Sequence, residues 1–176
     1  MHKAAVIVLL MLAGCGGGSS DGSQNGGFSA GGGGPDYDIK SFDIQTPSGD
    51  SFGGDAQINP GVSGGAFVPS WSVEDASSLY TAALYLSSDT MLSAGDQLFF
   101  DEVCGSVQAA CPDAASTSVD CTFNSSNVMQ CSGQPEDAVD LTAYLPGLPY
   151  NGYIILESCD SSGLDCVTAS HPVVLQ

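Results

Sequence analysis

Short runs of alternating apolar and polar residues, separated by turn-forming residues, recur through most of this chain. In one such run Phe67, Trp71 and Val73 fall on the same face. A period of two, bounded by Gly, Pro, Asn, Asp and Ser, predicts β-strands, and no segment shows the longer period of an amphipathic helix. Strands at roughly 8–15-residue spacing with turn signals between them predict an all-β fold, a β-sandwich with one core.

The alternation places the expected strands with some precision. The run 79–86 is apolar on both faces and predicts a central strand, whereas Pro172 predicts an edge or bulge. Trp71, the one tryptophan, is expected in the core. We expect strands at 42–45, 56–58, 67–73, 79–86, 97–104, 119–123, 128–131, 139–145, 152–159 and 166–175.

The first residues form a targeting signal rather than part of the fold. A short basic stretch, 1–3, precedes ten apolar residues, 4–13. As a helix ten residues cover about 15 Å, about half of a bilayer core of about 30 Å. This length predicts a secretory signal peptide rather than a membrane span.

The signal ends in Leu12-Ala13-Gly14-Cys15, which resembles the lipobox of bacterial lipoproteins. The resemblance implies cleavage before Cys15 and lipidation of its thiol with diacylglycerol, with fatty acyl chains of the palmitate type. Two or three acyl chains hold a protein stably on a membrane. Gly16 replaces the aspartate that serves as an inner-membrane retention signal in some bacteria. The resemblance therefore implies an outer-membrane location, on the periplasmic or the cell-surface side.

A glycine-rich tract follows Cys15 and separates the anchor from the folded part. Of the 20 residues in 16–35, 14 are Gly or Ser. Such a tract cannot offset the entropy of ordering, which predicts a flexible tether with a reach of roughly 25 Å. The expected organisation is a signal peptide at 1–14, a lipidated Cys15 and linker within 15–36, and a β-sandwich domain at 37–176.

The charge is strongly one-sided. The chain has 20 acidic residues and two basic ones, Lys3 and Lys40. Cleavage of the signal would remove Lys3 and leave Lys40 as the one cation. Nucleic-acid binding needs Lys and Arg to neutralise phosphates, so the composition excludes it, and it equally excludes electrostatic attachment to anionic membranes.

The cysteine count fits an oxidising compartment. Lipidation of Cys15 leaves six of the seven cysteines, an even set that predicts disulfides in a secreted protein. Their separations of seven, ten and seven residues favour three local bridges that stiffen loops. The expected pairs are Cys104–Cys111, Cys121–Cys131 and Cys159–Cys166. A zinc site is the rival interpretation, but the chain has no C-x-x-C and His171 is the one histidine outside the signal.

Two stretches sharpen the fold prediction. Residues 85–96 (YLSSDTMLSAGD) and 148–153 (LPYNGY) resemble the cell-adhesion-related domain found in bacteria. The resemblance spans about 67–176 and implies an immunoglobulin-like fold that serves as an extracellular interaction or spacer module. The chain departs from that family in its many cysteines and its single copy.

Two patterns raise the question of chemistry or metal binding. Residues 61–65 (GVSGG) match G-x-S-x-G, which makes Ser63 a candidate nucleophile with His171 as its base. The flanks predict no helix after Ser63, so the match fits a glycine-rich loop equally well. The alternative is a calcium site: Asp160 and Asp165 are the main candidate ligands, with Asp36, Asp38, Asp89 and Asp96 as further ones. Aspartate is also common in turns, and this interpretation competes with calcium.

These observations predict a lipid-anchored cell-envelope protein that acts as a non-catalytic binding or adhesion module without a cofactor. Its binding surface is expected on loops at one end of the sandwich. One alternative is a structural accessory subunit of an envelope assembly. Another is a small periplasmic hydrolase that uses Ser63, which requires Ser63 and His171 within hydrogen-bond reach.

Overall fold

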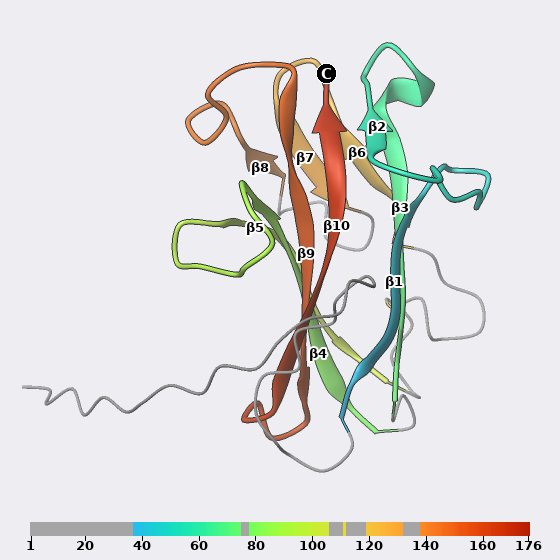
Figure 1. The fold of residues 1–176 in the computed structure, drawn as a ribbon, viewed down its shortest axis with the longest axis vertical. Coiled ribbons are helices and arrows are strands. Elements are labelled where there is room, and N and C mark those ends of the chain that lie inside the picture. The colour runs from blue at the N-terminus through green and yellow to red at the C-terminus, as the bar shows by residue number, and fades with distance from the viewer. Residues whose placement is uncertain (1–36, 75–77, 106–110, 112–118, 132–137) are drawn as a thin grey trace, which may run out of the picture.

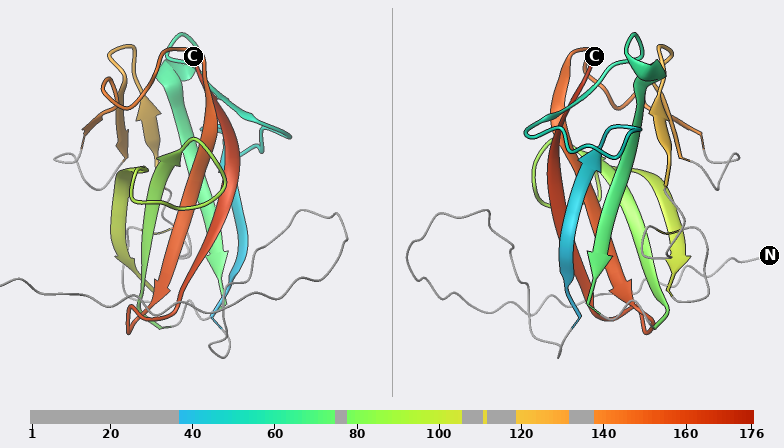
Figure 2. Two further views of the ribbon diagram at one scale, coloured as in Figure 1. Left: turned by 60° about the vertical axis from the view of Figure 1, so that its left-hand side comes forward. Right: turned by 90° about the vertical axis from the view of Figure 1, so that its right-hand side faces the viewer.

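The chain folds into two β-sheets packed face to face (Figures 1 and 2). In this computed structural model the described residues are 37–74, 78–105, 111, 119–131 and 138–176. The expected all-β sandwich is confirmed. The predicted signal, Cys15 and the linker lie outside the described residues, as does Asp36. No helix among the described residues is long and apolar enough to cross a membrane.

The first sheet contains five strands in the order β1-β3-β6-β7-β8, with antiparallel neighbours. Along β3, the residues at 67, 69, 71 and 73 are buried and those between them are partly exposed, as the alternation predicts. The strands of this sheet are β1 (Ile39–Gln45), β3 (Ala66–Val73), β6 (Cys121–Phe123), β7 (Val128–Cys131) and β8 (Val139–Asp140).

The second sheet also contains five strands, in the order β2-β10-β9-β4-β5. Its short edge strand β2 pairs in parallel with the last three residues of β10, and the other pairs are antiparallel. Pro172 lies just before the part of β10 that pairs with β2, at the open edge that its missing N–H favours. The strands are β2 (Ala56–Ile58), β4 (Tyr80–Ser87), β5 (Gln97–Cys104), β9 (Tyr150–Asp160) and β10 (Cys166–Leu175).

The core lies between the two sheets and is built from the inward-facing residues of both. Trp71 on β3 is 3% exposed and its ring meets Phe100 of β5 edge-on, with 6.2 Å between centroids. The expected core role of Trp71 is confirmed. Ser158, a fully buried polar residue, donates to the carbonyl of Thr81 and shares a hydrogen bond with the hydroxyl of Tyr37, so its burial carries no unpaired hydroxyl.

The strand order agrees with the immunoglobulin arrangement in one sheet and differs in the other. Immunoglobulin domains carry strands C, F and G side by side, and A, B, E and D in the opposite sheet. Here β4, β9 and β10 take the C-F-G order. In the first sheet, however, the strands after β3 run outward in chain order, β6-β7-β8, whereas the immunoglobulin order places the later strand beside B. The β-sandwich is shown, and the immunoglobulin-like assignment stays a prediction.

One predicted strand is wrong over most of its length. Residues 139–145 alternate between apolar and polar positions, but β8 ends at Asp140. The amide of Leu145 instead donates to the carbonyl of Leu141, which closes a single turn. This turn buries both leucines, at positions i and i+4, and leaves Thr142 and Ala143 exposed. A period of two over so few residues does not distinguish a strand from one helical turn.

The two ends of the sandwich differ in which segments they carry (Figures 1 and 2). We call the end where β1 begins the entry end; it also carries the end of β3, the start of β4 and the 161–165 turn between β9 and β10. We call the opposite end the uncharged end. It carries the β2–β3 connection (59–65), the β6–β7 turn (124–127) and the β8–β9 connection (141–149).

All three expected cysteine pairs are joined as disulfides: Cys104–Cys111, Cys121–Cys131 and Cys159–Cys166. Cys121 and Cys131 are register partners in neighbouring strands, and so are Cys159 and Cys166. These two bridges therefore brace hairpins, one toward the uncharged end and one at the entry end.

Candidate functional site

The uncharged end is a cluster of connections held together by contacts between them. The amide nitrogen of Leu141 donates to the carbonyl of Asn127, which ties the β8–β9 connection to the β6–β7 turn. The side chain of Asn59 donates to Gln176 at 3.0 Å, which ties the β2–β3 connection to the end of β10. Each of these connections is thus fixed to a neighbouring segment of the fold.

Glycine allows the β2–β3 connection to lie against β6. This connection ends in a short 3-10 turn, η1 (Ser63–Gly65), in which Gly64 and Gly65 have positive φ values of 65° and 71°. A Cβ atom on Gly65 would overlap the carbonyl oxygen of Phe123, whereas one on Gly64 would meet nothing. Gly65 is therefore required by a close backbone approach as well as by its backbone conformation.

The β6–β7 turn is fixed by its own side chains and by a disulfide below it. The side-chain oxygen of Asn124 accepts hydrogen bonds from the amides of Ser126 and Val128. Three residues below Asn124 along β6, Cys121 is bridged to Cys131. The Asn124 hydrogen bonds and the disulfide both restrain the turn, so its exposed Ser125 lies on a rigid hairpin.

Two tyrosines anchor the β8–β9 connection. The rings of Tyr144 and Tyr150 meet edge-on, with centroids 6.3 Å apart. Burial raises the pKa of both hydroxyls, and the carboxylates of Asp89 and Asp96 raise them further. Gly152 leaves the space that the Tyr150 ring occupies.

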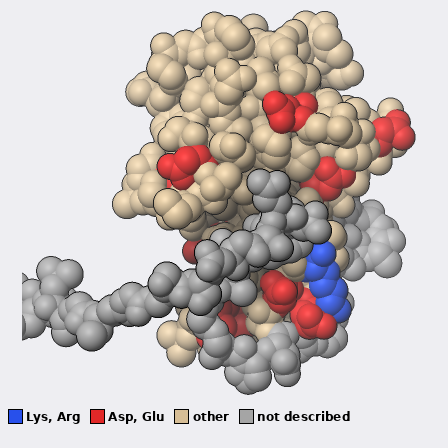
Figure 3. All heavy atoms as spheres, in the orientation of Figure 1, with Lys and Arg blue, Asp and Glu red and all other residues tan. Residues whose placement is uncertain are grey.

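The three connections at this end carry no charged side chain, and neither do the neighbouring strands β3, β6 and β7, in a chain of net charge −18. The acidic side chains visible in Figure 3 lie below the topmost part of that face, the highest of them in its upper third, and the topmost part shows none. Asp140, at the start of the β8–β9 connection, marks the border. Two apolar side chains are exposed within the uncharged end, Val62 at 64% and Leu148 at 44%.

The entry end has the opposite character. It carries Asp38, Glu74, Asp160 and Asp165. Lys40 lies 3.1 Å from the carboxylate of Glu74, with both side chains about half exposed. An exposed pair of this kind adds little stability.

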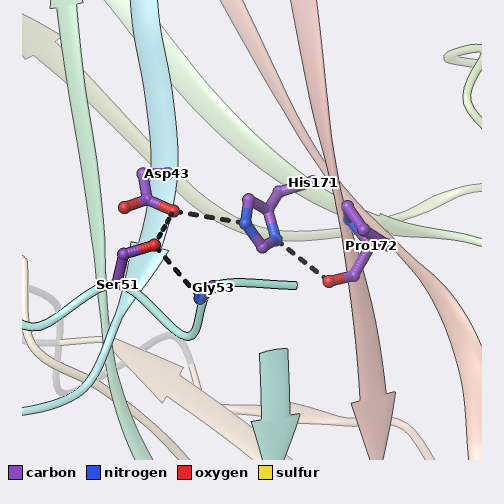
Figure 4. Close-up of polar contacts among 5 residues, drawn as sticks. All are labelled: Asp43, Ser51, Gly53, His171 and Pro172. Carbon is purple, nitrogen blue, oxygen red and sulfur yellow. Dashed lines mark hydrogen bonds and ion pairs between the residues drawn. The ribbon is translucent and has the colours of Figure 1, made fainter. Parts of the chain in front are cut away.

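His171 pairs with a carboxylate on the opposite sheet rather than with Ser63 (Figure 4). Its Nε2 atom lies 3.2 Å from Oδ1 of Asp43 on β1, and its Nδ1 atom lies 2.9 Å from the carbonyl oxygen of Pro172. Both ring nitrogens therefore face oxygen acceptors, and a protonated ring can donate to both. Ser63 lies in η1, and no hydrogen bond among the described residues joins it to His171.

The polar group around Asp43 does not have the order that nucleophilic catalysis needs. The hydroxyl of Ser51 donates to the same Oδ1 atom of Asp43, at 3.3 Å. A catalytic triad places the imidazole between the serine and the carboxylate, so that the ring can take the serine proton. Here the carboxylate lies between the other two groups. The arrangement joins β1 to β10 across the open edge of the sandwich, which is a structural role.

The carboxylates proposed for calcium serve as turn anchors. Asp160 accepts hydrogen bonds from the hydroxyl of Ser162 and from the amides of Ser162, Leu164 and Asp165. The Ser162 hydroxyl, followed by these amides, lowers the pKa of Asp160. Asp89 accepts from the amide of Met91, and Asp96 from that of Ser93. These contacts are those of aspartate in turns.

One group of residues in the described part of the chain has the spacing of a metal site. It consists of Glu157, Cys159 and Cys166, whose potential ligand atoms lie within 4.8 Å of one another. The two sulfurs are joined in a disulfide, and a metal needs thiolates. This group does not fit a zinc ion while the bridge is intact.

Comparisons with known proteins add no relative. No family model matches the chain, and neither a curated protein nor a solved structure matches it. The site must therefore be judged from its geometry. The partnership of Asp43 with His171 was not predicted from the sequence, because it depends on β1 lying against β10, and no local pattern encodes that packing.

Proposed function

We propose that the protein is a lipid-anchored component of the bacterial cell envelope that binds a partner through its uncharged end and carries out no chemistry. The observation that carries the proposal is the polarity of the domain. The chain enters the first strand at the acidic entry end, and the connections without charge lie at the opposite end. A tether attached at the entry end leaves the uncharged end free to face away from the membrane.

Three features support the proposed anchor and location. Cys15 ends an apolar signal in the pattern of a lipobox, and a 20-residue tract rich in Gly and Ser follows it. The three disulfides suit an oxidising compartment. Gly16, which follows Cys15, favours the outer membrane.

The geometry of the uncharged end supports binding rather than catalysis. Its connections are braced by Cys121–Cys131 and by the Gly65–Phe123 approach, so binding would require little reordering. His171, the histidine a Ser63 hydrolase would need, has both ring nitrogens beside oxygens of Asp43 and Pro172. We therefore place the function in the surface that the loops present.

The anchor is tested by mass spectrometry of the N-terminal peptide from membranes. We expect the mature chain to start at Cys15 and to carry a diacylglycerol, and we expect a Cys15→Ala variant to remain unprocessed. An unmodified Cys15 in a soluble mature chain would contradict the proposal.

The binding surface is tested by capture from solubilised envelopes with three baits, the chain from residue 16 onward and its Ser125→Asp and Leu164→Asp variants. Ser125 lies at the uncharged end, and Leu164, 85% exposed, lies at the entry end. We expect a partner captured by wild type and by L164D but lost with S125D. Loss with L164D alone would place the binding surface at the entry end and contradict the proposal.

A further inference from the structure

The hairpin of β9 and β10 carries two sulfurs and a carboxylate on one face at the entry end. Glu157 and Cys159 are two residues apart on β9, so their side chains point to the same face of the sheet. Cys166 is the register partner of Cys159 on β10, and the potential ligand atoms of all three lie within 4.8 Å of one another. Among the described residues, neither of the other two disulfides has a carboxylate placed in this way.

The carboxylate of Glu157 is held in place by a hydrogen bond from outside the group. The hydroxyl of Tyr85 on β4 donates to Oε2 of Glu157 at 3.1 Å, and no described residue donates to Oε1. One carboxylate oxygen is therefore fixed, and the other is available as a ligand. Hydrogen bonds of this kind orient the carboxylate ligands of metal sites.

The strands around the group are paired well beyond the disulfide. β9 pairs with β10 at ten register positions, and with β4 at eight on its other side. Opening the bridge would therefore leave the two cysteines opposite each other on neighbouring strands. A Zn²⁺ ion with two thiolates at about 2.3 Å each holds its sulfurs about 3.8 Å apart. Opposed residues of an antiparallel pair are close enough to allow this separation.

We propose that Glu157, Cys159 and Cys166 form a redox-gated site for a thiophilic divalent cation of the Zn²⁺ type. While the bridge is closed, the sulfurs are not thiolates and the site is shut. A dithiol reductant opens it by exchange at the exposed Cys166. The reductant gives up two electrons and two protons and becomes a disulfide, and the chain gains two thiols. The cation then displaces both thiol protons and binds the two sulfurs and Oε1 of Glu157.

The donor set determines which cation is bound. Two thiolates and one carboxylate suit Zn²⁺ or Cd²⁺, whereas Ca²⁺ and Mg²⁺ take oxygen ligands. The net charge of −18 attracts cations of every kind to this chain, so selectivity must come from the sulfurs. Three protein ligands leave the fourth tetrahedral position to water. This site lies at the entry end and does not depend on the partner proposed for the uncharged end.

Metal titration of the chain from residue 16 onward tests the proposal, because this chain lacks Cys15 and gains thiols only from its bridges. Mild reductant is applied without air and then removed, and alkylation with mass spectrometry locates the thiols. Competition with a chromophoric chelator measures Zn²⁺ binding, and Co²⁺ reports thiolate ligands by its charge-transfer absorbance. We expect thiols at Cys159 and Cys166, one Zn²⁺ bound per reduced chain, and none bound by the oxidised chain. A large excess of Ca²⁺ should not displace the Zn²⁺.

Three variants distinguish this site from a simple pair of thiols. Tyr85→Phe keeps all three ligands but removes the hydrogen bond to Glu157, and it should weaken Zn²⁺ binding about tenfold. Glu157→Gln removes a ligand and should weaken binding by more than Tyr85→Phe does. Glu74→Gln is the matched control, since Glu74 lies at the same end but outside the group, and this variant should bind as wild type does.

A reduced chain that binds no Zn²⁺ would overturn the proposal, as would equal binding by the oxidised chain. Binding that Glu157→Gln leaves unchanged, or thiols that appear first at another bridge, would also contradict it. Far-UV circular dichroism must show that the reduced chain keeps its strands, because unfolding on reduction would contradict a site built on paired strands. None of these results affects the capture of a partner through Ser125.

Discussion

The indole nitrogen of Trp71 donates a hydrogen bond to the hydroxyl of Tyr80 across the core of the sandwich, with 3.1 Å between the two atoms. Trp71 lies on β3 of one sheet and Tyr80 on β4 of the other. Both side chains are buried, at 3% and 1% exposure. This bond gives the apolar contact between the sheets a fixed register.

Replacement of Trp71 by Phe should lower the free energy of unfolding by about 2–4 kcal/mol, because it removes this bond and leaves a cavity. Tyr80→Phe leaves the buried indole N–H without its acceptor and should cost about 1–3 kcal/mol. Urea unfolding followed by circular dichroism measures both, since the Trp71 variant lacks the one tryptophan. The double variant should lose less free energy of unfolding than the two single variants lose together. If the two losses simply add, the hydrogen bond does not couple the sheets.

Alanine substitutions at Gly65 and Gly64 test how closely η1 packs against β6. Both have positive φ, so alanine should cost about 1 kcal/mol at either position. At Gly65 the added methyl also overlaps the Phe123 carbonyl, so we expect a loss of more than about 3 kcal/mol there. Thermal and urea unfolding compare the two variants. Equal losses would mean that the approach is not tight.

The titration of Tyr85 should make the free energy of unfolding depend on pH in the alkaline range. The Tyr85 hydroxyl donates a hydrogen bond to the carboxylate of Glu157, with 3.1 Å between the two oxygens. Burial, and after it the charge of Glu157, raises the pKa of Tyr85 from 10.0 to about 12. The unfolded chain therefore loses this proton first, and stability should fall as the pH rises from about 10 to about 12. Below this window Tyr85 is protonated in both states and contributes no pH dependence.

Ultraviolet absorbance of tyrosinate follows the same titration. Glu157→Gln should lower the pKa of Tyr85 but leave it above 10.0, because burial remains its largest cause. Asp101→Asn is the control, since Asp101 makes the smallest contribution. A larger effect from Asp101→Asn than from Glu157→Gln would contradict the assignment.

The three disulfides should differ in their response to mild reductant. Cys166 is exposed, whereas Cys104, Cys111 and Cys121 are fully buried. Because exchange needs access to a sulfur atom, Cys159–Cys166 should be reduced first. Stepwise alkylation and mass spectrometry give the order. Early reduction of Cys121–Cys131 would show that the hairpin below the uncharged end opens readily, against its proposed rigidity.

Most of the fold could be predicted from local patterns. The alternation in 67–73 correctly gave β3, and the boundaries of β5, β7 and β10 were those expected. The disulfide pairs followed from short spacings, since nearby cysteines flank hairpin turns. The 139–145 prediction failed because Leu141 and Leu145 satisfy burial equally well in one helical turn.

The candidate site was harder to predict because it is a property of the assembled fold. Val62, Ser125 and Leu148 are far apart in the sequence, and only the strand order brings their connections to one end. The absence of charge in 56–73, 121–131 and 141–156 was readable in the sequence. Its meaning depended on the sheet topology. The Asp43–His171 contact was equally non-local.

The most direct test of the account is photo-crosslinking in intact cells, with a photoreactive amino acid placed at Ser125 or, in a parallel strain, at Leu164. We predict that light produces a defined crosslinked species from position 125, either a dimer of this chain or a complex with another protein, and none from position 164. Crosslinking from position 164 with none from position 125 would contradict the claim that the uncharged end is the binding surface.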